Sequence, residues 1–278
     1  MANQVTGALS GNCPIGVFDS GIGGLTVVKE MLRIMPFEDI IYFGDTARLP
    51  YGSKSNRLLI QYSIENSIFL KSRDVKMIVI ACNTASAASA DYLRSFINIP
   101  VIGVIECGAL GAVRATRNKR VGVIGTKSTI NSHAYSKTIN SLDSSIEVFE
   151  LATPLLVHLV EENWIEKDIT INILEEYLQP LVKNEIDTLV LGCTHYPLLR
   201  KQIHGVIENI ILVDSADEVA IFVNDTLRVQ CILTDRKEPG TTKVFLSDVH
   251  PEVSKWMKEF LGKDISADLI DIEKHGLY

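Results

Sequence analysis

The sequence lacks an apolar run that approaches the length of a membrane span, and it lacks a basic segment followed by an apolar one near its start. We therefore expect a cytoplasmic protein that makes no use of a membrane. An excess of positive charge is also missing, since 27 basic side chains stand against 34 acidic ones and the formal net charge is −7. Because this charge offers no general attraction to phosphate backbones, nucleic acid is not expected as a main partner.

The chain has few cysteines, and none of them forms a CxxC pair. Their odd number and wide spacing argue against both a disulfide framework and a structural zinc site. A cysteine with a special role should therefore act as a thiol, and no metal site is predicted. The cysteines are Cys13, Cys82, Cys107, Cys193 and Cys231.

Hydrophobic residues make up 46% of the 278 positions, which is enough for a substantial core. Short runs rich in Val and Ile alternate with longer amphipathic patterns, and this alternation predicts an α/β fold with mostly parallel sheets. The predicted strands are 15–19, 39–43, 76–81, 101–105, 120–125, 146–151, 188–192, 210–213, 242–246 and 267–272. The clearest predicted helices are 25–35, 55–72, 169–184 and 216–232.

Two sequence echoes indicate that the chain consists of related halves. The segment IVIACNTAS at 78–86 resembles LVLGCTHYP at 189–197, and IGVFDSG at 15–21 resembles VGVIGTKS at 121–128. Both pairs have a similar separation along the chain, which favours a duplication, although buried strands also produce short echoes by chance.

Cys82 follows an apolar strand and precedes a helix of small residues. This position is the carboxyl end of a strand, where active-site crevices of α/β proteins lie. A helix N-terminus beyond the sulfur is expected to lower the pKa of the thiol from about 8.5. The alternative is a buried cysteine that acts as a small apolar side chain, against which the polar neighbours Asn83 and Thr84 argue.

Cys193 has the same kind of position, after a strand and before Thr194 and His195. His195 is expected to orient or protonate a group near this sulfur, while a solvated or capping histidine is the alternative. Two thiols at equivalent strand ends are more specific than either one alone, because related halves would aim both into one cleft.

The segment DSGIGG at 19–24 joins a strand to a helix and offers free N–H groups for an anion. The glycines also fit a tight turn that needs positive φ. Asp19 is a candidate partner for a substrate ammonium group or for proton transfer, and capping by Asp19 or Ser20 is the alternative.

The segment GDTARLPYGSKS at 44–55 gathers polar groups after the second strand and is a candidate wall of a substrate site. Ser53 and Ser55 also suit helix capping. The remaining cysteines, Cys13, Cys107 and Cys231, are interpreted as non-catalytic.

Four ordered motifs, FDSGIGGLTV at 18–27, GDTARLPYGSKS at 44–55, ACNTAS at 81–86 and GCTHYPLL at 192–199, give the chain a close resemblance to the glutamate racemases of the aspartate/glutamate racemase superfamily. The resemblance implies two similar parallel-sheet α/β domains that face a central cleft and are related by a pseudo-twofold axis. It implies a first domain of 1–106 plus 216–278 and a second domain of 107–215.

The resemblance also implies a cofactor-independent isomerase that interconverts L- and D-glutamate and supplies D-glutamate for peptidoglycan. A monomer or homodimer and an activating cell-wall precursor would belong to the same picture. Inversion of a stereocentre through a planar carbanion needs proton removal on one face and proton return on the other, which suits a coupled pair of thiols.

In family terms, Cys82 and Cys193 look like the two bases, with Asp19 assisting Cys82 and His195 assisting Cys193. The matching substrate-binding positions are Asp19, Ser20, Pro50, Tyr51, Gly52, Asn83, Thr84, Thr126, Thr129, Glu161 and Thr194.

The segment ATPLLVHLVEEN at 152–163 departs from the family pattern, because Thr153 stands where a Cys is expected and His158 where a second Pro is expected. His158 is interpreted as structural. Three other functions stay open at this point: racemisation of aspartate or another acidic amino acid, a binding or regulatory protein on a racemase scaffold, and a hydrolase with a thiol nucleophile.

Overall fold

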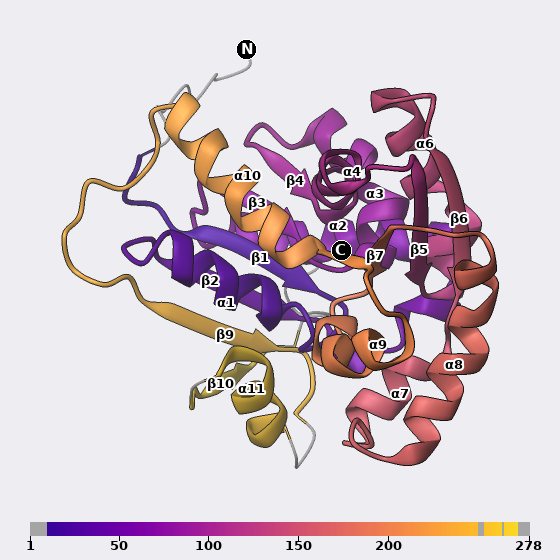
Figure 1. Cartoon of the computed structure of the whole chain (residues 1–278). Helices are drawn as coiled ribbons and strands as arrows, with labels where there is room; N and C mark the ends of the chain where they lie inside the picture. The colour runs from indigo at the N-terminus through magenta and orange to yellow at the C-terminus, as the bar shows by residue number, and fades with distance from the viewer. Residues whose placement is uncertain (1–9, 250–252, 263, 272–278) are drawn as a thin grey trace.

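The computed structural model of the chain describes residues 10–249, 253–262 and 264–271, and within them it contains two parallel β-sheets (Figure 1). The first sheet has the strand order β10-β9-β2-β1-β3-β4, and the second has the order β6-β5-β7-β8. Every strand pair in both sheets is parallel. The fold is therefore α/β with two sheets, as the sequence predicts.

The strands of the first sheet are β1 (Ile15–Asp19), β2 (Ile40–Gly44), β3 (Met77–Ile80), β4 (Val101–Gly103), β9 (Thr242–Leu246) and β10 (Ala267–Leu269). Those of the second are β5 (Arg120–Gly125), β6 (Glu147–Ala152), β7 (Thr188–Gly192) and β8 (Ile211–Asp214). The central strands are buried on both faces, which explains why they read as continuous apolar runs.

The two sheets share one topology. The order β2-β1-β3-β4 corresponds strand by strand to β6-β5-β7-β8, so that β1 takes the place of β5 and β3 the place of β7. These are the strands that carry the two sequence echoes. The related halves predicted from those echoes thus have equivalent positions in their sheets, and β9 and β10 extend the first sheet alone.

Helices cover the faces of both sheets (Figure 1). Their bounds are α1 (Leu25–Ile34), α2 (Asn56–Lys71), α3 (Asn83–Phe96), α4 (Val104–Ala115), α5 (Lys127–Ser132), α6 (Ala134–Leu142), α7 (Leu155–Glu161), α8 (Asp168–Lys183), α9 (Arg200–Val206), α10 (Ser215–Val229) and α11 (Val253–Leu261). Short 3₁₀ turns are η1 (Thr46–Arg48), η2 (Tyr51–Ser53) and η3 (Tyr196–Leu199).

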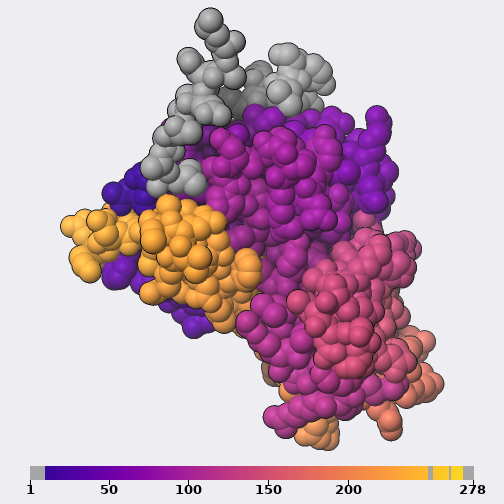
Figure 2. Space-filling model, turned by 90° about the horizontal axis from the view of Figure 1, so that it is seen from above, coloured from indigo at the N-terminus to yellow at the C-terminus, as the bar shows by residue number. Residues whose placement is uncertain are grey.

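Helix α10 joins the halves, because it follows the last strand of the second sheet and packs against α1 and α4. In Figure 2 the orange atoms of this part of the chain lie against indigo and purple atoms that are distant in sequence. After α10 the chain returns to the first sheet with β9, which pairs with β2. We therefore propose the division into 1–106 plus 216–278 and 107–215, in which α4 and α10 form the connections.

The predicted strand at 101–105 is wrong at its carboxyl end, because β4 ends at Gly103 and α4 begins at Val104. Val104 and Ile105 are buried as helix residues. A short apolar run does not by itself distinguish a buried strand from the first turn of a buried helix. The end of the predicted strand 267–272 at Ile272 lies outside the described residues, and β10 ends at Leu269.

Candidate active site

The loops at the carboxyl ends of β1, β2, β3, β5 and β7 surround a cavity of about 350 Å³ between the two halves. This edge of a parallel sheet is the usual location of ligand sites in α/β proteins. The predicted site residues in its wall are Ser20, Pro50, Tyr51, Gly52, Cys82, Asn83, Thr84, Thr126, Glu161, Cys193, Thr194 and His195. Asp19 and Thr129 are buried next to the wall and do not line the cavity.

Cys82 is the N-cap of α3, and its sulfur accepts a hydrogen bond from the N–H of Ala85 at 3.5 Å. The thiol lies 3.6 Å from the hydroxyl oxygen of Ser20. The pKa of Cys82 is nevertheless raised from 9.0 to about 12, chiefly by burial and then by the charge of Asp19. The expected lowering of this pKa by the helix N-terminus is therefore wrong, because burial outweighs the single N–H donor.

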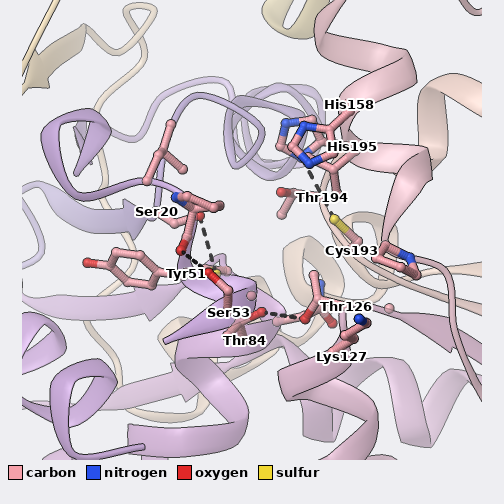
Figure 3. A pocket seen from close by; sticks show the side chains of 18 of the residues that line it. Ser20, Tyr51, Ser53, Thr84, Thr126, Lys127, His158, Cys193, Thr194 and His195 are labelled. Atoms are coloured by element: carbon pink, nitrogen blue, oxygen red, sulfur yellow. Dashed lines mark hydrogen bonds between the residues drawn. The ribbon is translucent and has the colours of Figure 1, made fainter. Parts of the chain in front are cut away.

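Cys193 lies beside a cationic partner (Figure 3). Its sulfur is 3.8 Å from Nδ1 of His195, and Nε2 of His195 is 3.2 Å from Oε1 of Glu161, off the axis of a hydrogen bond. Burial lowers the pKa of His195, but the interactions with Cys193 and Glu161 outweigh it and raise this pKa from 6.5 to about 10. The imidazolium therefore stabilises negative charge on the Cys193 sulfur.

Asp19 ends β1 and is fully buried. Its Oδ2 accepts a hydrogen bond from the N–H of Gly21 at 3.0 Å, whereas Oδ1 has no partner within the described residues. Burial raises the pKa of Asp19, although the charge of His195 and backbone N–H groups oppose this rise. An unpartnered buried carboxylate oxygen next to a cavity is a feature that calls for a ligand or a proton.

Gly21, Gly23 and Gly24, in the loop after β1, do not have a left-handed conformation. Glycine is needed there because other segments approach the loop closely, not because the backbone requires positive φ. A Cβ on Gly23 would lie 2.5 Å from Oγ1 of Thr194 and 2.8 Å from the ring of His195. The bare backbone of this loop thus allows the two halves to meet beside the cavity.

Three threonine hydroxyl groups connect the halves at another side of the cavity. Oγ1 of Thr84 lies 2.9 Å from Oγ1 of Thr126 and 3.2 Å from Oγ1 of Thr129, which are 3.0 Å from each other. Thr126 is also the N-cap of α5, where it accepts a hydrogen bond from the N–H of Thr129. Thr129 thus supports the wall from behind.

The loop after β2 is held by a buried polar network. The hydroxyl of Tyr51 donates to Asp45, and Nε of Arg48 donates to the same carboxylate at 2.7 Å. The hydroxyl of Ser247, after β9, donates to the other oxygen of Asp45 at 3.1 Å. This network fixes the part of the wall formed by Pro50 and Gly52.

Asn83 lines the cavity and has a buried donor without a partner in the described part of the chain. Its Oδ1 accepts a hydrogen bond from the hydroxyl of Tyr135 at 2.7 Å, and this bond orients the amide. Its buried Nδ2 has no partner within the described residues. A buried amide N–H₂ group held in this way is suited to donate to a carboxylate oxygen, including one onto which the charge of a carbanion is delocalised.

Several residues of the cavity wall were not predicted as site residues from the sequence, among them Lys127, Pro154 and Val157. His158, interpreted as structural rather than catalytic, has a side chain that is 66% exposed and lines the cavity. The departure at Thr153 is accommodated in the core, where its Oγ1 lies 2.8 Å from the hydroxyl of Tyr196. Only the packing of distant segments brings these residues to the site.

In residues 10–249, 253–262 and 264–271, no helix has both the length and the apolar character to cross a bilayer. The same ranges contain no group of three or more His, Cys, Asp or Glu side chains placed to hold a metal ion.

This geometry suits proton transfer at a carbon atom. Two buried thiols line one cavity, one beside a carboxyl group and one beside an imidazolium, and both lie next to polar donors. Such groups can remove a proton, return a proton and stabilise the negative charge formed in between.

Comparisons with known proteins agree with this chemistry. Residues 45–221 match the Asp/Glu/Hydantoin racemase family. A glutamate racemase of Geobacter metallireducens is 49% identical over 89% of this chain and 92% of its own length. The crystal structure of glutamate racemase from Francisella tularensis in complex with D-glutamate has a TM-score of 0.89 and 36% identity, and the match covers 95% of this chain and 99% of that one.

A less similar structure, Escherichia coli glutamate racemase with L-glutamate and the activator UDP-MurNAc-ala, has a TM-score of 0.73 and 29% identity, with 90% of this chain and 94% of that chain covered. The family match extends over more than half of the chain, and the curated relative covers nearly all of it. The chain therefore belongs to the Asp/Glu/Hydantoin racemase family, in which its relatives are glutamate racemases and hence isomerases.

Proposed function

We propose that this protein interconverts L-glutamate and D-glutamate by a two-base mechanism in which Cys82 and Cys193 act on opposite faces of the substrate Cα. The observation that carries the proposal is the placement of both sulfurs in the wall of one cavity, at equivalent strand ends of two halves with the same topology. The substrate belongs to the class on which the relatives act.

In one direction, the Cys193 thiolate removes the Cα proton and the Cys82 thiol returns a proton to the other face. His195 stabilises the thiolate, and the raised pKa of Cys82 keeps a proton ready on that sulfur. The reverse direction exchanges the two protonation states, so the thiols form a coupled pair. Because a single base does not easily reach both faces, each thiol is needed in both directions.

The polar wall would bind the charged groups of glutamate. Ser20 would receive the ammonium group, with the carboxyl group of Asp19 buried behind the wall, and Asn83 would donate to a carboxylate. Thr84, Thr126 and Thr194, with the loop at Pro50, Tyr51 and Gly52, would complete the site, while Thr129 and Glu161 support Thr126 and His195. These donors would lower the energy of the carbanion without an organic cofactor.

The proposed physiological role is to produce, in the cytoplasm, D-glutamate that is used for peptidoglycan. This role rests on membership of the family. Activation by a cell-wall precursor belongs to the same proposal, and the complex of the Escherichia coli relative with UDP-MurNAc-ala supports it.

Circular dichroism of the purified protein with each enantiomer of glutamate and of aspartate tests this function. We expect both glutamate enantiomers to reach a racemic mixture and aspartate, one methylene shorter, to react about 10- to 200-fold more slowly. Racemisation of aspartate at the rate of glutamate, or of neither amino acid, would contradict the proposal.

A further inference from the structure

Two basic side chains at the mouth of the cavity have no place in the two-thiol chemistry. Lys127 is the first residue of α5, and His158 lies on α7. Both are exposed, both line the cavity, and Figure 3 shows them on different sides of it. The thiols lie deeper, since Cys82 and Cys193 are only 6% and 7% exposed.

Basic side chains outnumber carboxylates in the lining of the cavity. His158 is one helical turn from Glu161, and its Nδ1 lies 4.0 Å from Oε2 of that carboxylate. The same carboxylate is also within 3.2 Å of His195, which is a cation because its pKa is raised to about 10. Among the residues that line the cavity, three basic side chains, Lys127, His158 and His195, thus stand against one carboxylate, that of Glu161.

The net charge of the whole protein works against its substrate. Glutamate carries two carboxylates and one ammonium group, and the formal charge of the chain is −7. Long-range repulsion therefore slows the approach of the substrate unless the entrance carries the opposite sign of charge. Cations in a cleft with low-dielectric walls raise the local concentration of an anionic ligand.

We propose that Lys127 and His158 form an entrance pair that captures the free carboxylate of the dicarboxylic substrate and guides it to the thiols. The inference rests on the proposed glutamate racemisation and deepens it, because it assigns the preference for a second carboxylate to named residues.

The test compares K127Q, H158Q and the double variant with wild type in initial-rate measurements on L-glutamate at low ionic strength. We expect kcat/KM to fall about 3- to 10-fold in the double variant, with most of the change in KM, because the pair acts on capture.

Salt separates capture from a structural effect. Between about 20 mM and 0.5 M salt, kcat/KM of wild type should fall towards that of the double variant, whose own rate should respond weakly. The matched control is K183Q/H204Q, which removes an exposed Lys and an exposed His from helices outside the cavity lining. Equal salt responses in wild type and the double variant, or an equal loss in the control, would overturn the inference. Failure of wild type to racemise glutamate would instead overturn the proposed function.

Discussion

The surroundings of Cys82 and of Cys193 differ although the two strand ends are equivalent. Cys82 caps a full helix and stands near the buried carboxyl group of Asp19. Cys193 precedes only the short turn η3 and has the His195 ring 3.8 Å from its sulfur. The common topology thus places the two thiols alike, while their neighbours differ in charge.

The comparison shows that the topology of the sheets sets the position of a thiol, whereas neighbouring side chains and burial set its electrostatic surroundings. The helix N-terminus at Cys82, which suggests a reactive thiolate, is outweighed by burial and by a nearby anion. The turn at Cys193 has no comparable helix, yet it holds the cation that a thiolate needs. Four experiments test or sharpen this comparison.

The largest effect is expected from loss of either sulfur. C82A and C193A should each lower racemisation at least ~10³-fold in both directions, because each removes one of two obligatory proton-transfer groups. Circular dichroism measures the rate. In heavy water, each variant should retain exchange of the Cα proton from one enantiomer only. Near-normal turnover of either variant, or exchange from both enantiomers, would show that the two-base assignment is wrong.

Loss of the neighbouring charges should have a smaller effect. D19N and H195N are expected to lower kcat/KM about 10²-fold, since each assists one proton transfer. The equilibrium constant of a racemisation is 1, so kcat/KM must stay equal in the two directions and only kcat and KM can differ. If one variant has the lower kcat with L-glutamate and the other has the lower kcat with D-glutamate, the two thiols have distinct roles. If kcat is lower with the same enantiomer in both variants, the comparison fails.

The cation at His195 should make stability depend on pH. Its pKa is raised from 6.5 to about 10 in the folded protein, so folding binds a proton that the unfolded chain releases above about pH 6.5. This contribution is complete below pH 6.5 and is lost as the pH rises through 10. Denaturant unfolding of wild type and H195Q should therefore converge between these values. A gap that widens with rising pH would contradict the raised pKa.

The smallest effect concerns the seam between the halves. G23A places a methyl group 2.5 Å from Oγ1 of Thr194 and should destabilise the protein by about 1–3 kcal/mol, with some loss of activity. The control G205A, where nothing lies within 4 Å, should be neutral or stabilising by about 0.5–1 kcal/mol because Ala favours a helix. Thermal unfolding compares them. Equal stability of the two variants would argue against close contact at Gly23.

Much of the fold could be predicted because strands that are buried on both faces leave a plain pattern. β1, β5, β7 and β9 begin and end where the sequence predicts. The error at Val104 arose where a helix begins directly after a strand and is equally apolar. Local patterns do not contain the long-range packing that decides such a case.

Some residues of the candidate site could be predicted from the sequence, and others could not. Cys82, Asn83 and Thr194 follow strands directly, and the parallel topology brings such positions to one edge. Lys127 and His158 lie on short helices whose approach to the cavity depends on the packing of the second half. The sequence context of Lys127 is ordinary, and the departure from the family pattern at His158 does not by itself show that this side chain reaches the cavity.

The sequence by itself determined the α/β class, the pairing of two strand-end thiols and the family, because apolar periodicity and residue identity are local properties of the chain. Only the tertiary structure decided which neighbours share a cavity with each sulfur. It also decided that burial raises the pKa of Cys82 and that Glu161 and Cys193 together hold a proton on His195. Burial and charge–charge distance arise from packing between segments far apart in the chain, and for that reason they cannot be read along it.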